Sequence, residues 1–359
     1  MKLPTKTFLE VLNVVYSRLR EKPPKYLPIL IAFVTYRCNL KCSFCGLCEL
    51  RENTDKNELS TDEWENIYIS AKRLGTLITS ISGGEPILRK DLETIIESAS
   101  KREISVHLCT NGTLIDKERA KNLEKAGTKI ISFSLDSNIE EIHDMIRGKG
   151  QFRKTLDGIE NVRTYSPSIR ISINAVLCRK NYRDIHKLVQ FAKKLGAVQI
   201  KFAPIHTNLL HKFKDKSEWC EFYFTEGDLK ELDEEIKKIY TECKKMGMLT
   251  TSLTFYKGVI RNFAGVNKFS CYAGFLDCII TPDGRVGACC DIESNLSVKT
   301  KPLEEIWNSN EFHRYRIKVA QCNKYCWDTT NTEFSLRLNP KTMLYELPTM
   351  MKEFLFYLR

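Results

Sequence analysis

The chain has 359 residues, of which 42% are hydrophobic and 10% aromatic, a composition that supports a large core and argues against disorder. This length favours one large barrel with an added module, or two domains. The net charge of +11 comes from basic residues scattered along the sequence, which suits an anionic substrate or surface and argues against nucleic acid as the partner.

Fourteen cysteines are many for a chain of this length, and they bear on where the protein works. The N-terminal apolar stretch contains Glu10 and Asn13 and is followed by basic residues, unlike a secretory signal. No apolar run reaches the roughly 18 residues of a membrane span. We therefore expect a cytoplasmic protein whose thiolates bind metal or do chemistry rather than form disulfides.

The predicted elements begin with an amphipathic helix over residues 5–20, which Pro23 and Pro24 end. A nearly continuous apolar run from Ile29 predicts a strand buried on both faces. Strands and helices then alternate, with a capping box at Ser60 opening the helix that follows this strand. Further strands are predicted at Leu77 to Ser82, Ser105 to Cys109, Lys129 to Leu135, Ile169 to Leu177 and Val198 to Phe202, and further helices near 90–101, 116–126, 152–164 and 182–195.

Six strand-then-helix units predict an α/β fold with a parallel sheet, either open or curled into a partial (β/α)6 barrel of TIM type. Polar turn residues follow the first four strands. Because ligands bind at the carboxyl ends of the strands in such sheets, these loops are expected to meet at one mouth.

Beyond residue 250 the alternation stops, and a Pro-Asp-Gly turn between Ile279 and Val286 predicts a β-hairpin. Cysteines gather on both sides of this turn, which indicates a small cysteine-rich module. The expected divisions are an N-terminal helix and lead-in over 1–28, a barrel over 29–250, the module over 251–335 and an apolar tail over 336–359.

Cys38-x3-Cys42-x2-Cys45 places three thiolates within eight residues where the first strand ends. Three thiolates can hold three irons of a cubane cluster and leave the fourth iron open, whereas four thiolates close a cluster for electron transfer. A zinc site completed by Cys48 or a histidine is the alternative, although zinc sites usually show paired ligands.

This spacing, with Phe44 before the last cysteine, resembles the radical S-adenosylmethionine (radical SAM) superfamily, and the resemblance covers Ile29 to Cys326. It implies a [4Fe–4S] cluster on Cys38, Cys42 and Cys45, with S-adenosylmethionine as cofactor. Reductive cleavage of that cofactor would give a 5'-deoxyadenosyl radical. The resemblance also implies an external one-electron reductant of the flavodoxin or ferredoxin type.

Gly83-Gly84-Glu85-Pro86 resembles the family's Gly-Gly-Glu-Pro loop, in which Glu85 would accept hydrogen bonds from the methionine ammonium. The glycines would let the backbone approach the ligand. A Gly-Gly turn alone is weak support. Its position after the second predicted strand, about forty residues beyond the cysteines, makes the match specific.

Two later segments resemble the same family. Thr110-Asn111-Gly112 matches its third-strand turn, although an ordinary tight turn predicts the same residues. From Ser134 to Gly148 the chain resembles the fourth-strand segment, where a polar residue reaches the ribose and an arginine pairs with the cofactor carboxylate. His143 is either part of that segment or a helix-surface residue. The cofactor-binding positions expected from the resemblance are Phe44, Gly83, Gly84, Glu85, Pro86, Asn111, Ser134, Asp136 and Arg147.

The C-terminal module gives a second resemblance. The spacing from Cys271 through Gly284 to Cys289, followed by Cys322-x3-Cys326, resembles SPASM and twitch auxiliary-cluster domains. A full SPASM domain carries more cysteines, so this chain resembles the shorter twitch form with one auxiliary [4Fe–4S] cluster. Its ligands would be Cys271, Cys289, Cys322 and Cys326.

Other cysteines leave alternatives open. Cys278 or Cys290 could replace a predicted ligand or face the substrate, and a zinc ribbon would also account for the module. The cysteines predicted to be packing residues are Cys109, Cys178, Cys220 and Cys243.

The expected function is therefore that of a radical SAM enzyme that abstracts hydrogen from a small-molecule, lipid-linked or peptide substrate, with the auxiliary cluster assisting electron transfer or substrate binding. About 28 residues precede the first strand, too few for a peptide-recognition domain, which favours small-molecule or lipid chemistry over a peptide-modifying maturase. A non-catalytic iron–sulfur carrier or scaffold is the alternative, but it would not need Glu85 or Arg147.

The two ends of the chain have two interpretations. The first helix has Lys6, Arg18 and Arg20 near its ends, and the segment from Met343 to Arg359 is rich in apolar residues. Such elements usually pack on their own barrel. Alternatively, they form a surface for peripheral contact with an anionic membrane, which would favour an amphiphilic substrate.

Overall fold

The protein is described here by a computed structural model covering residues 5–47, 57–205, 221–264, 269–292, 294–323 and 326–358. Its described strands form one eight-stranded sheet in the order β6-β5-β4-β3-β2-β1-β7-β8. The strands are β1 (Ile29–Thr35), β2 (Ile78–Gly83), β3 (Ser105–Thr110), β4 (Thr128–Ser134), β5 (Arg170–Leu177), β6 (Gln199–Pro204), β7 (Asp277–Ile280) and β8 (Val286–Gly287). All neighbours are parallel except β7 and β8, which are antiparallel.

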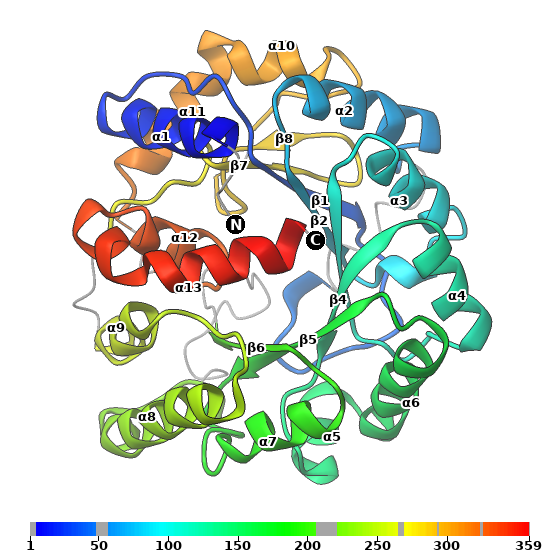
Figure 1. Ribbon diagram of the computed structural model, residues 1–359, viewed down its shortest axis with the longest axis vertical. Helices are drawn as coiled ribbons and strands as arrows, with labels where there is room; N and C mark the ends of the chain where they lie inside the picture. The colour runs from blue at the N-terminus through cyan, green and yellow to red at the C-terminus, as the bar shows by residue number, and fades with distance from the viewer. Residues whose placement is uncertain are drawn as a thin grey trace.

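Helices surround the curved sheet (Figure 1). Their bounds are α1 (Thr5–Leu19), α2 (Thr61–Arg73), α3 (Leu92–Ser100), α4 (Lys117–Lys125), α5 (Glu140–Arg147), α6 (Gln151–Tyr165), α7 (Lys187–Lys194), α8 (Leu229–Met246), α9 (Leu253–Phe263), α10 (Leu303–Asn308), α11 (Asn310–Ala320), α12 (Asn331–Arg337) and α13 (Pro340–Leu358). This arrangement confirms the predicted α/β fold with a partial barrel. The strands carry apolar residues on both faces, so both faces of the sheet must be covered.

Local sequence signals place most of these elements. The capping box at Ser60 is present: Glu63 N–H donates to its hydroxyl, and its own N–H donates to the Glu63 carboxylate at 2.7 Å. The helix predicted from residue 182 begins only at Lys187. Asp184 has φ of 60°, a left-handed conformation that a helix does not accommodate.

The C-terminal hairpin is part of the barrel sheet rather than only appended to it. Strand β7 pairs with β1 in the register Ile29 with Asp277, and every residue of β7 is buried. The predicted Pro-Asp-Gly turn joins β7 to β8, with φ of 90° at Gly284. The cysteine-rich segment is therefore fixed directly to the strand that leads into Cys38.

Both ends of the described chain pack on this fold, as the first interpretation expects. In α1, Val14 and Val15 pack with Tyr272 and Phe275 of the C-terminal module. Helix α13 crosses the barrel beside α12 and reaches the strands (Figure 1), where Tyr357 is 6% exposed. No helix among the described residues is long and apolar enough to cross a membrane.

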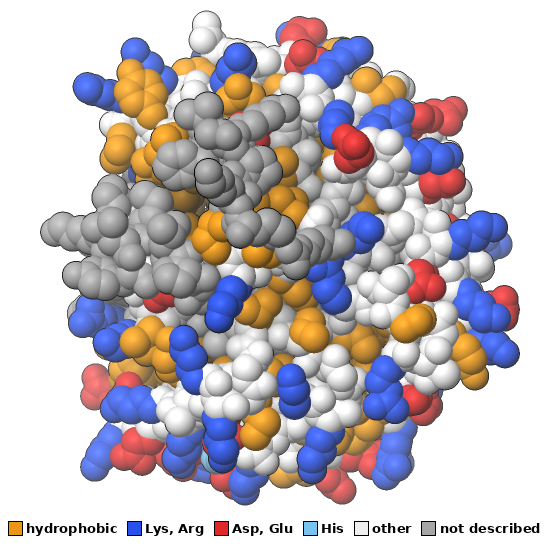
Figure 2. Space-filling model, viewed as in Figure 1, with side chains coloured by type: hydrophobic (Ala, Val, Ile, Leu, Met, Phe, Trp, Pro, Cys, Tyr) orange, Lys and Arg blue, Asp and Glu red, His pale blue; other side chains and the backbone are white. Residues whose placement is uncertain are grey.

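The charge of the surface is mixed. The described Lys and Arg side chains on the face in Figure 2 are spread over it and interspersed with Asp and Glu. This distribution agrees with the scattered charge of the sequence and gives no support to a nucleic-acid surface on that face.

Candidate functional site

The cysteine loop leaves β1 at the carboxyl edge of the sheet. Burial raises the pKa of Cys42 to about 11, Arg147 lowers it, and the neighbouring Cys45 and Cys38 raise it further. The three thiols are thus close enough for their charges to repel once they ionise. A cationic cluster would remove that repulsion, so the donor set fits a [4Fe–4S] cluster with three thiolate ligands. Cys48, the alternative ligand, lies outside the described residues.

Two neighbouring segments hold this loop. Ser43 donates from its backbone N and from its hydroxyl to the carbonyl of Ile146, at 2.9 and 3.0 Å. The loop after β2 donates from Gly84 N to Thr35 O at 2.8 Å and from Glu85 N to Arg37 O at 2.7 Å. A cluster held there would be anchored from both sides.

The two glycines make this backbone contact possible. A Cβ at Gly83 would lie 2.1 Å from Thr35 O, and one at Gly84 would lie 2.2 Å from Arg37 O. We expected the glycines to let the backbone approach a ligand. The close approach in the structure is instead to the cysteine loop, because the carbonyls of residues 35–37 occupy the space that side chains would need.

Glu85 is completely buried. It accepts hydrogen bonds from Thr110 Oγ1 at 2.7 Å, Asn111 N at 2.7 Å and Ile87 N at 3.0 Å. Burial raises its pKa, and these hydrogen bonds and Arg147 oppose the rise. Two carboxylate oxygens can accept about four hydrogen bonds, so one acceptor position remains for a further donor such as an ammonium.

Arg147, at the end of α5, forms a two-pronged ion pair with Asp136. Its Nε lies 2.6 Å from Asp136 Oδ2 and its Nη2 lies 3.1 Å from Oδ1. Its Nη1 lies 4.0 Å from Cys42 Sγ, and the guanidinium stacks 5.5 Å from the centre of the Phe44 ring. Arg147 is thus a cation fixed beside the thiols, with Asp136 as its partner.

The other predicted positions have structural contacts of their own. Asn111 donates from Nδ2 to Asn39 Oδ1 at 2.9 Å, joining the third-strand turn to the cysteine loop. Ser134 lies at the end of β4 and lines a cavity together with Arg147. Pro86 is buried at the start of a short 3-10 helix. Sequence reasoning missed Asn39, and its position between two of the cysteines is the signal that could have found it.

His143 is not a helix-surface residue. It is completely buried in α5, and its Nδ1 accepts a hydrogen bond from Asp136 N at 3.2 Å. Burial lowers its pKa to about 4, so the imidazole is neutral near pH 7. The hydrogen bond places its proton on Nε2, and the ring holds the backbone that presents Asp136 to Arg147.

The auxiliary cysteines lie beside the barrel sheet and α1. Arg18 Nε donates to the carbonyl of Cys271 at 2.7 Å. Burial raises the pKa of Cys271, and the negative charges of Cys289 and Asp328 raise it further. Because Asp328 comes two residues after Cys326, the chain next to Cys326 comes toward Cys271 and Cys289. That Cys322 is the fourth ligand stays a prediction, and residues 324–325 lie outside the described chain.

The extra cysteines differ in their surroundings. Cys278 is completely buried in β7 within the main core, and burial raises its pKa. This placement makes it a packing residue rather than a substitute ligand. Cys290 is exposed and hydrogen-bonds Cys289, lowering the pKa of Cys289. Of the predicted packing cysteines, Cys178 and Cys243 are buried, Cys109 faces a cavity, and Cys220 lies outside the described residues.

The barrel interior holds residues that the sequence analysis did not single out as functional. A cavity of about 80 Å³ is lined by His107, Lys201 and Tyr357 among others. An adjoining cavity of about 120 Å³ is lined by Lys201, Ser134 and Arg147. Polar residues inside otherwise apolar strand patterns were the available signal for His107 and Lys201. The geometry therefore combines a three-thiol loop, a carboxylate, a fixed guanidinium and an interior chamber.

Comparison with known proteins agrees with this geometry. Residues 33–192 match the model of the radical SAM superfamily, and residues 271–328 match the model of the SPASM iron–sulfur cluster-binding domain. The chain therefore contains a radical SAM domain followed by a SPASM iron–sulfur domain. Its radical SAM domain carries the cysteine loop, and its SPASM domain carries the auxiliary cysteines. A [4Fe–4S] cluster, S-adenosylmethionine and an auxiliary iron–sulfur site are the cofactors of this domain pair.

Among its relatives, the chain is 35% identical over 179 residues to the Fe-coproporphyrin III synthase of Methanosarcina barkeri, a match that covers 47% of this chain and 44% of that protein. The chain thus spans about half the length of that relative. It is 27% identical to the PqqA peptide cyclase of Rhizobium meliloti, covering 82% of this chain and 77% of that protein.

Solved structures show the same fold. The structure of Streptococcus suis SuiB bound to its precursor peptide SuiA superposes with a TM-score of 0.66 at 20% identity, covering 88% of this chain and 72% of that chain. The AdoMet-bound structure of anSMEcpe gives a TM-score of 0.59 at 18% identity, covering 90% and 98%. At these identities the likeness concerns the fold alone.

Proposed function

We propose that this chain is an enzyme that reductively cleaves S-adenosylmethionine and abstracts hydrogen from an organic substrate inside the barrel. The observation that supports this most is the meeting of three elements at one edge of the sheet. Arg147 pairs with Asp136, acts on the charges of both Cys42 and Glu85, and lines the interior chamber. An electron carrier would need the thiols but not Glu85 or the Arg147–Asp136 pair.

In this proposal Cys38, Cys42 and Cys45 hold the [4Fe–4S] cluster and leave one iron open for the cofactor. When bound, the cluster would supply the electron for reductive cleavage of the cofactor. The residues of the chain bind, orient and shield. Glu85 offers its remaining acceptor position to the methionine ammonium, since three of about four positions are already filled.

Arg147 would act mainly by placing a fixed positive charge beside the cluster. Asp136 uses two edges of the guanidinium, which leaves Nη1 toward Cys42 and the side of the cluster. A fixed cation there stabilises thiolate over thiol. Ser134 lines the same cavity as Arg147 and would contact the ribose. A substrate bound in the chamber would displace water from the reacting carbon.

Cys271, Cys289, Cys322 and Cys326 would hold one auxiliary [4Fe–4S] cluster. It would accept an electron from the substrate radical or relay one, and an external reductant of the flavodoxin or ferredoxin type would supply the first cluster. The contact of Arg18 with the Cys271 carbonyl would keep the auxiliary site fixed to the barrel.

Replacing Cys38, Cys42 and Cys45 together with alanine tests the central proposal. The variant is expected to form no 5'-deoxyadenosine when reduced anaerobically with S-adenosylmethionine, while the wild-type protein forms it at least slowly. Cys243→Ala is the matched control, because Cys243 is a buried packing thiol of α8. Deoxyadenosine formation by the triple variant would overturn the assignment. Its absence from the wild-type protein would favour a carrier or scaffold.

A peptide is the second candidate for the substrate, favoured by the match to a peptide cyclase over 82% of this chain. Fractions of a cell extract can be tested for faster deoxyadenosine formation. A peptide substrate requires the active fraction to lose its effect after protease treatment. A small-molecule or lipid-linked substrate keeps its effect.

A further inference from the structure

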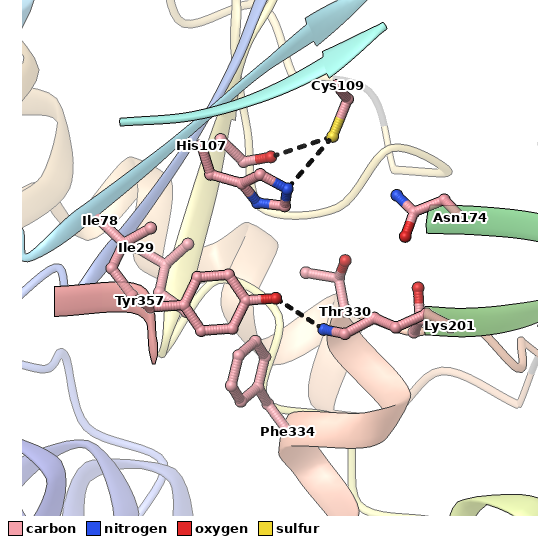
Figure 3. Close-up of a pocket in the computed structure, with 11 residues that line it drawn as sticks. Ile29, Ile78, His107, Cys109, Asn174, Lys201, Thr330, Phe334 and Tyr357 are labelled. Carbon is pink, nitrogen blue, oxygen red and sulfur yellow. Dashed lines mark hydrogen bonds between the residues drawn. The ribbon is translucent and has the colours of Figure 1, made fainter. Parts of the chain in front are cut away.

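The interior of the barrel is a chamber that joins the predicted cofactor site to the C-terminal helix. The cavity of about 80 Å³, here the lower cavity, is lined by Tyr357 of α13 and by His107 and Cys109 of β3. The cavity of about 120 Å³, here the upper cavity, is lined by Arg147. Lys201 is among the three residues that line both cavities. In Figure 3 the Tyr357 hydroxyl points toward the Lys201 ammonium, with His107, Cys109 and Asn174 around the same space.

The Lys201 ammonium is held in place by α13. Its Nζ lies 2.8 Å from Tyr357 Oη and 3.1 Å from Glu353 Oε1. An ammonium has three N–H donors, so these two contacts leave one. Tyr357 is itself fixed because its hydroxyl donates to Gln199 Oε1 at 3.1 Å. The remaining donor of Lys201 therefore belongs to a positioned cation on the chamber wall.

Lys201 belongs to a buried network of ion pairs. Glu353 is shared between Lys201 and Arg337, and Arg337 also pairs with Glu333. Two cations and two carboxylates thus form a buried network whose positive end, Lys201, lines the chamber, whereas its other three members do not line either cavity. The opposite walls carry neutral groups: burial lowers the pKa of His107 to about 3 and raises that of Cys109 to about 11.

Lys201 is suited to anchoring rather than to proton transfer. Burial opposes its charge, but Tyr357 and Glu353 outweigh burial and hold its pKa above the ordinary value. It therefore stays protonated across the physiological range and cannot serve as a base. The neighbouring Asn174 Oδ1 is buried with no hydrogen-bond partner among the described residues. The chamber wall therefore also offers an acceptor for a hydrogen bond from a ligand.

We propose that Lys201 anchors a carboxylate of the substrate inside the barrel, with Tyr357 and Glu353 of α13 positioning its ammonium. The proposal rests on the proposed function and narrows it to substrates that bear a carboxylate near the carbon that loses hydrogen. Lys201 lines both cavities, so a carboxylate bound to it would lie next to the cavity that Arg147 and Ser134 line. Lys201 would contact the substrate, and the C-terminal helix would set the depth of the chamber.

Cys109 lines the same cavity as Lys201 and can report on it. Iodoacetate and iodoacetamide differ mainly in carrying a carboxylate or an amide, and both alkylate thiols. Trypsin releases Cys109 in the peptide 103–117, which contains no other cysteine. Mass spectrometry of that peptide from the full-length protein, loaded with clusters and S-adenosylmethionine, gives the alkylation rate for each reagent.

The ratio of the iodoacetate rate to the iodoacetamide rate at Cys109 is expected to fall about tenfold in Lys201→Met, as for loss of a charged hydrogen bond. It is expected to persist in Lys201→Arg. The ratio cancels any change in the pKa of Cys109, because both reagents consume the same thiolate. Lys238→Met is the matched control, since Lys238 also pairs with a buried glutamate, Glu235, but lies on α8. Its ratio should equal that of the wild-type protein.

A second measurement uses the wild-type protein alone and so does not depend on the folding of a variant. Propionate should slow the alkylation of Cys109 by iodoacetamide, and propionamide at the same concentration should not. Equal effects of the two probes, or an unchanged ratio in a folded Lys201→Met variant, would overturn the proposal. So would failure of both reagents to reach Cys109, since the chamber must admit a carboxylate.

Deoxyadenosine formation measured on the same samples separates this proposal from the proposed function. Deoxyadenosine formation together with an unchanged alkylation ratio refutes the anchor alone. No deoxyadenosine together with a ratio that depends on Lys201 refutes the proposed function alone.

Discussion

Glu85 shows how one side chain serves both folding and the predicted site. Its carboxylate joins the loop after β2 to the turn after β3 through Thr110 and Asn111. Burial of a charge is costly unless hydrogen bonds compensate, and here three do. The same contacts fix the direction of the remaining acceptor position, which we propose binds the cofactor.

Glu85→Gln is expected to lower the free energy of unfolding by about 1–3 kcal/mol, because the glutamine NH2 must face an N–H or O–H donor. Cofactor affinity should fall as well. Urea unfolding and calorimetric titration with S-adenosylmethionine measure the two effects.

Glu63→Gln is the control for this change, since glutamine also completes a capping box and should cost little. Unaltered cofactor affinity in Glu85→Gln would show that Glu85 does not contact the cofactor. Unaltered stability would contradict the hydrogen-bond argument.

At the scale of elements, the site depends on two loops pressed together. Gly84→Ala is expected to push the loop after β2 away from the cysteine loop, because its Cβ would meet backbone oxygens at 2.2 and 2.5 Å. A backbone clash of this kind belongs to the strongly destabilising class, above about 3 kcal/mol. Retained iron should fall together with the melting temperature.

Gly150→Ala separates this steric effect from backbone strain. Gly150 has φ of 78° but no atom within 4 Å of its added Cβ, so only the left-handed conformation is penalised, by about 1–2 kcal/mol. Equal losses in the two variants would argue against loop contact as the reason for Gly84.

The C-terminal helix is the other element on which the interior depends. Glu353→Gln would leave Lys201 and Arg337 buried without their shared carboxylate. Breaking a buried ion pair in this way costs about 3–5 kcal/mol, which urea unfolding can measure.

Glu311→Gln, an exposed change on α11, should alter stability by less than about 0.5 kcal/mol. A similarly small change in Glu353→Gln would mean that α13 does not hold the barrel.

At the scale of the whole molecule, the radical SAM and SPASM domains share one sheet through the pairing of β1 with β7. The two predicted clusters nevertheless use separate loops. Anaerobically purified protein is expected to contain about eight irons, as for two [4Fe–4S] clusters, and Cys271→Ala with Cys289→Ala should leave about four. Metal analysis for iron and zinc gives the counts.

Deoxyadenosine formation should survive the loss of Cys271 and Cys289, because Cys38, Cys42 and Cys45 remain. Cys278→Ala provides the control, since Cys278 is a core residue and should not change the iron content. Stoichiometric zinc in the wild-type module would refute the auxiliary cluster.

The sequence by itself determined the strand and helix alternation, the cysteine loop, the hairpin turn and the domain pair. These features depend on local periodicity, turn chemistry and ligand spacing, which are written in neighbouring residues. Arg147 and Asp136 were also both expected at the site from their segment.

Only the tertiary structure decided what depends on residues distant in the chain. It paired Arg147 with Asp136, buried His143, and brought Tyr357 and Glu353 to Lys201 across more than 150 positions. It also placed β7 beside β1. The physical reason is that a buried charge needs a partner close in space, whatever its position in the sequence. A pattern of neighbouring residues does not specify which distant residue that partner is.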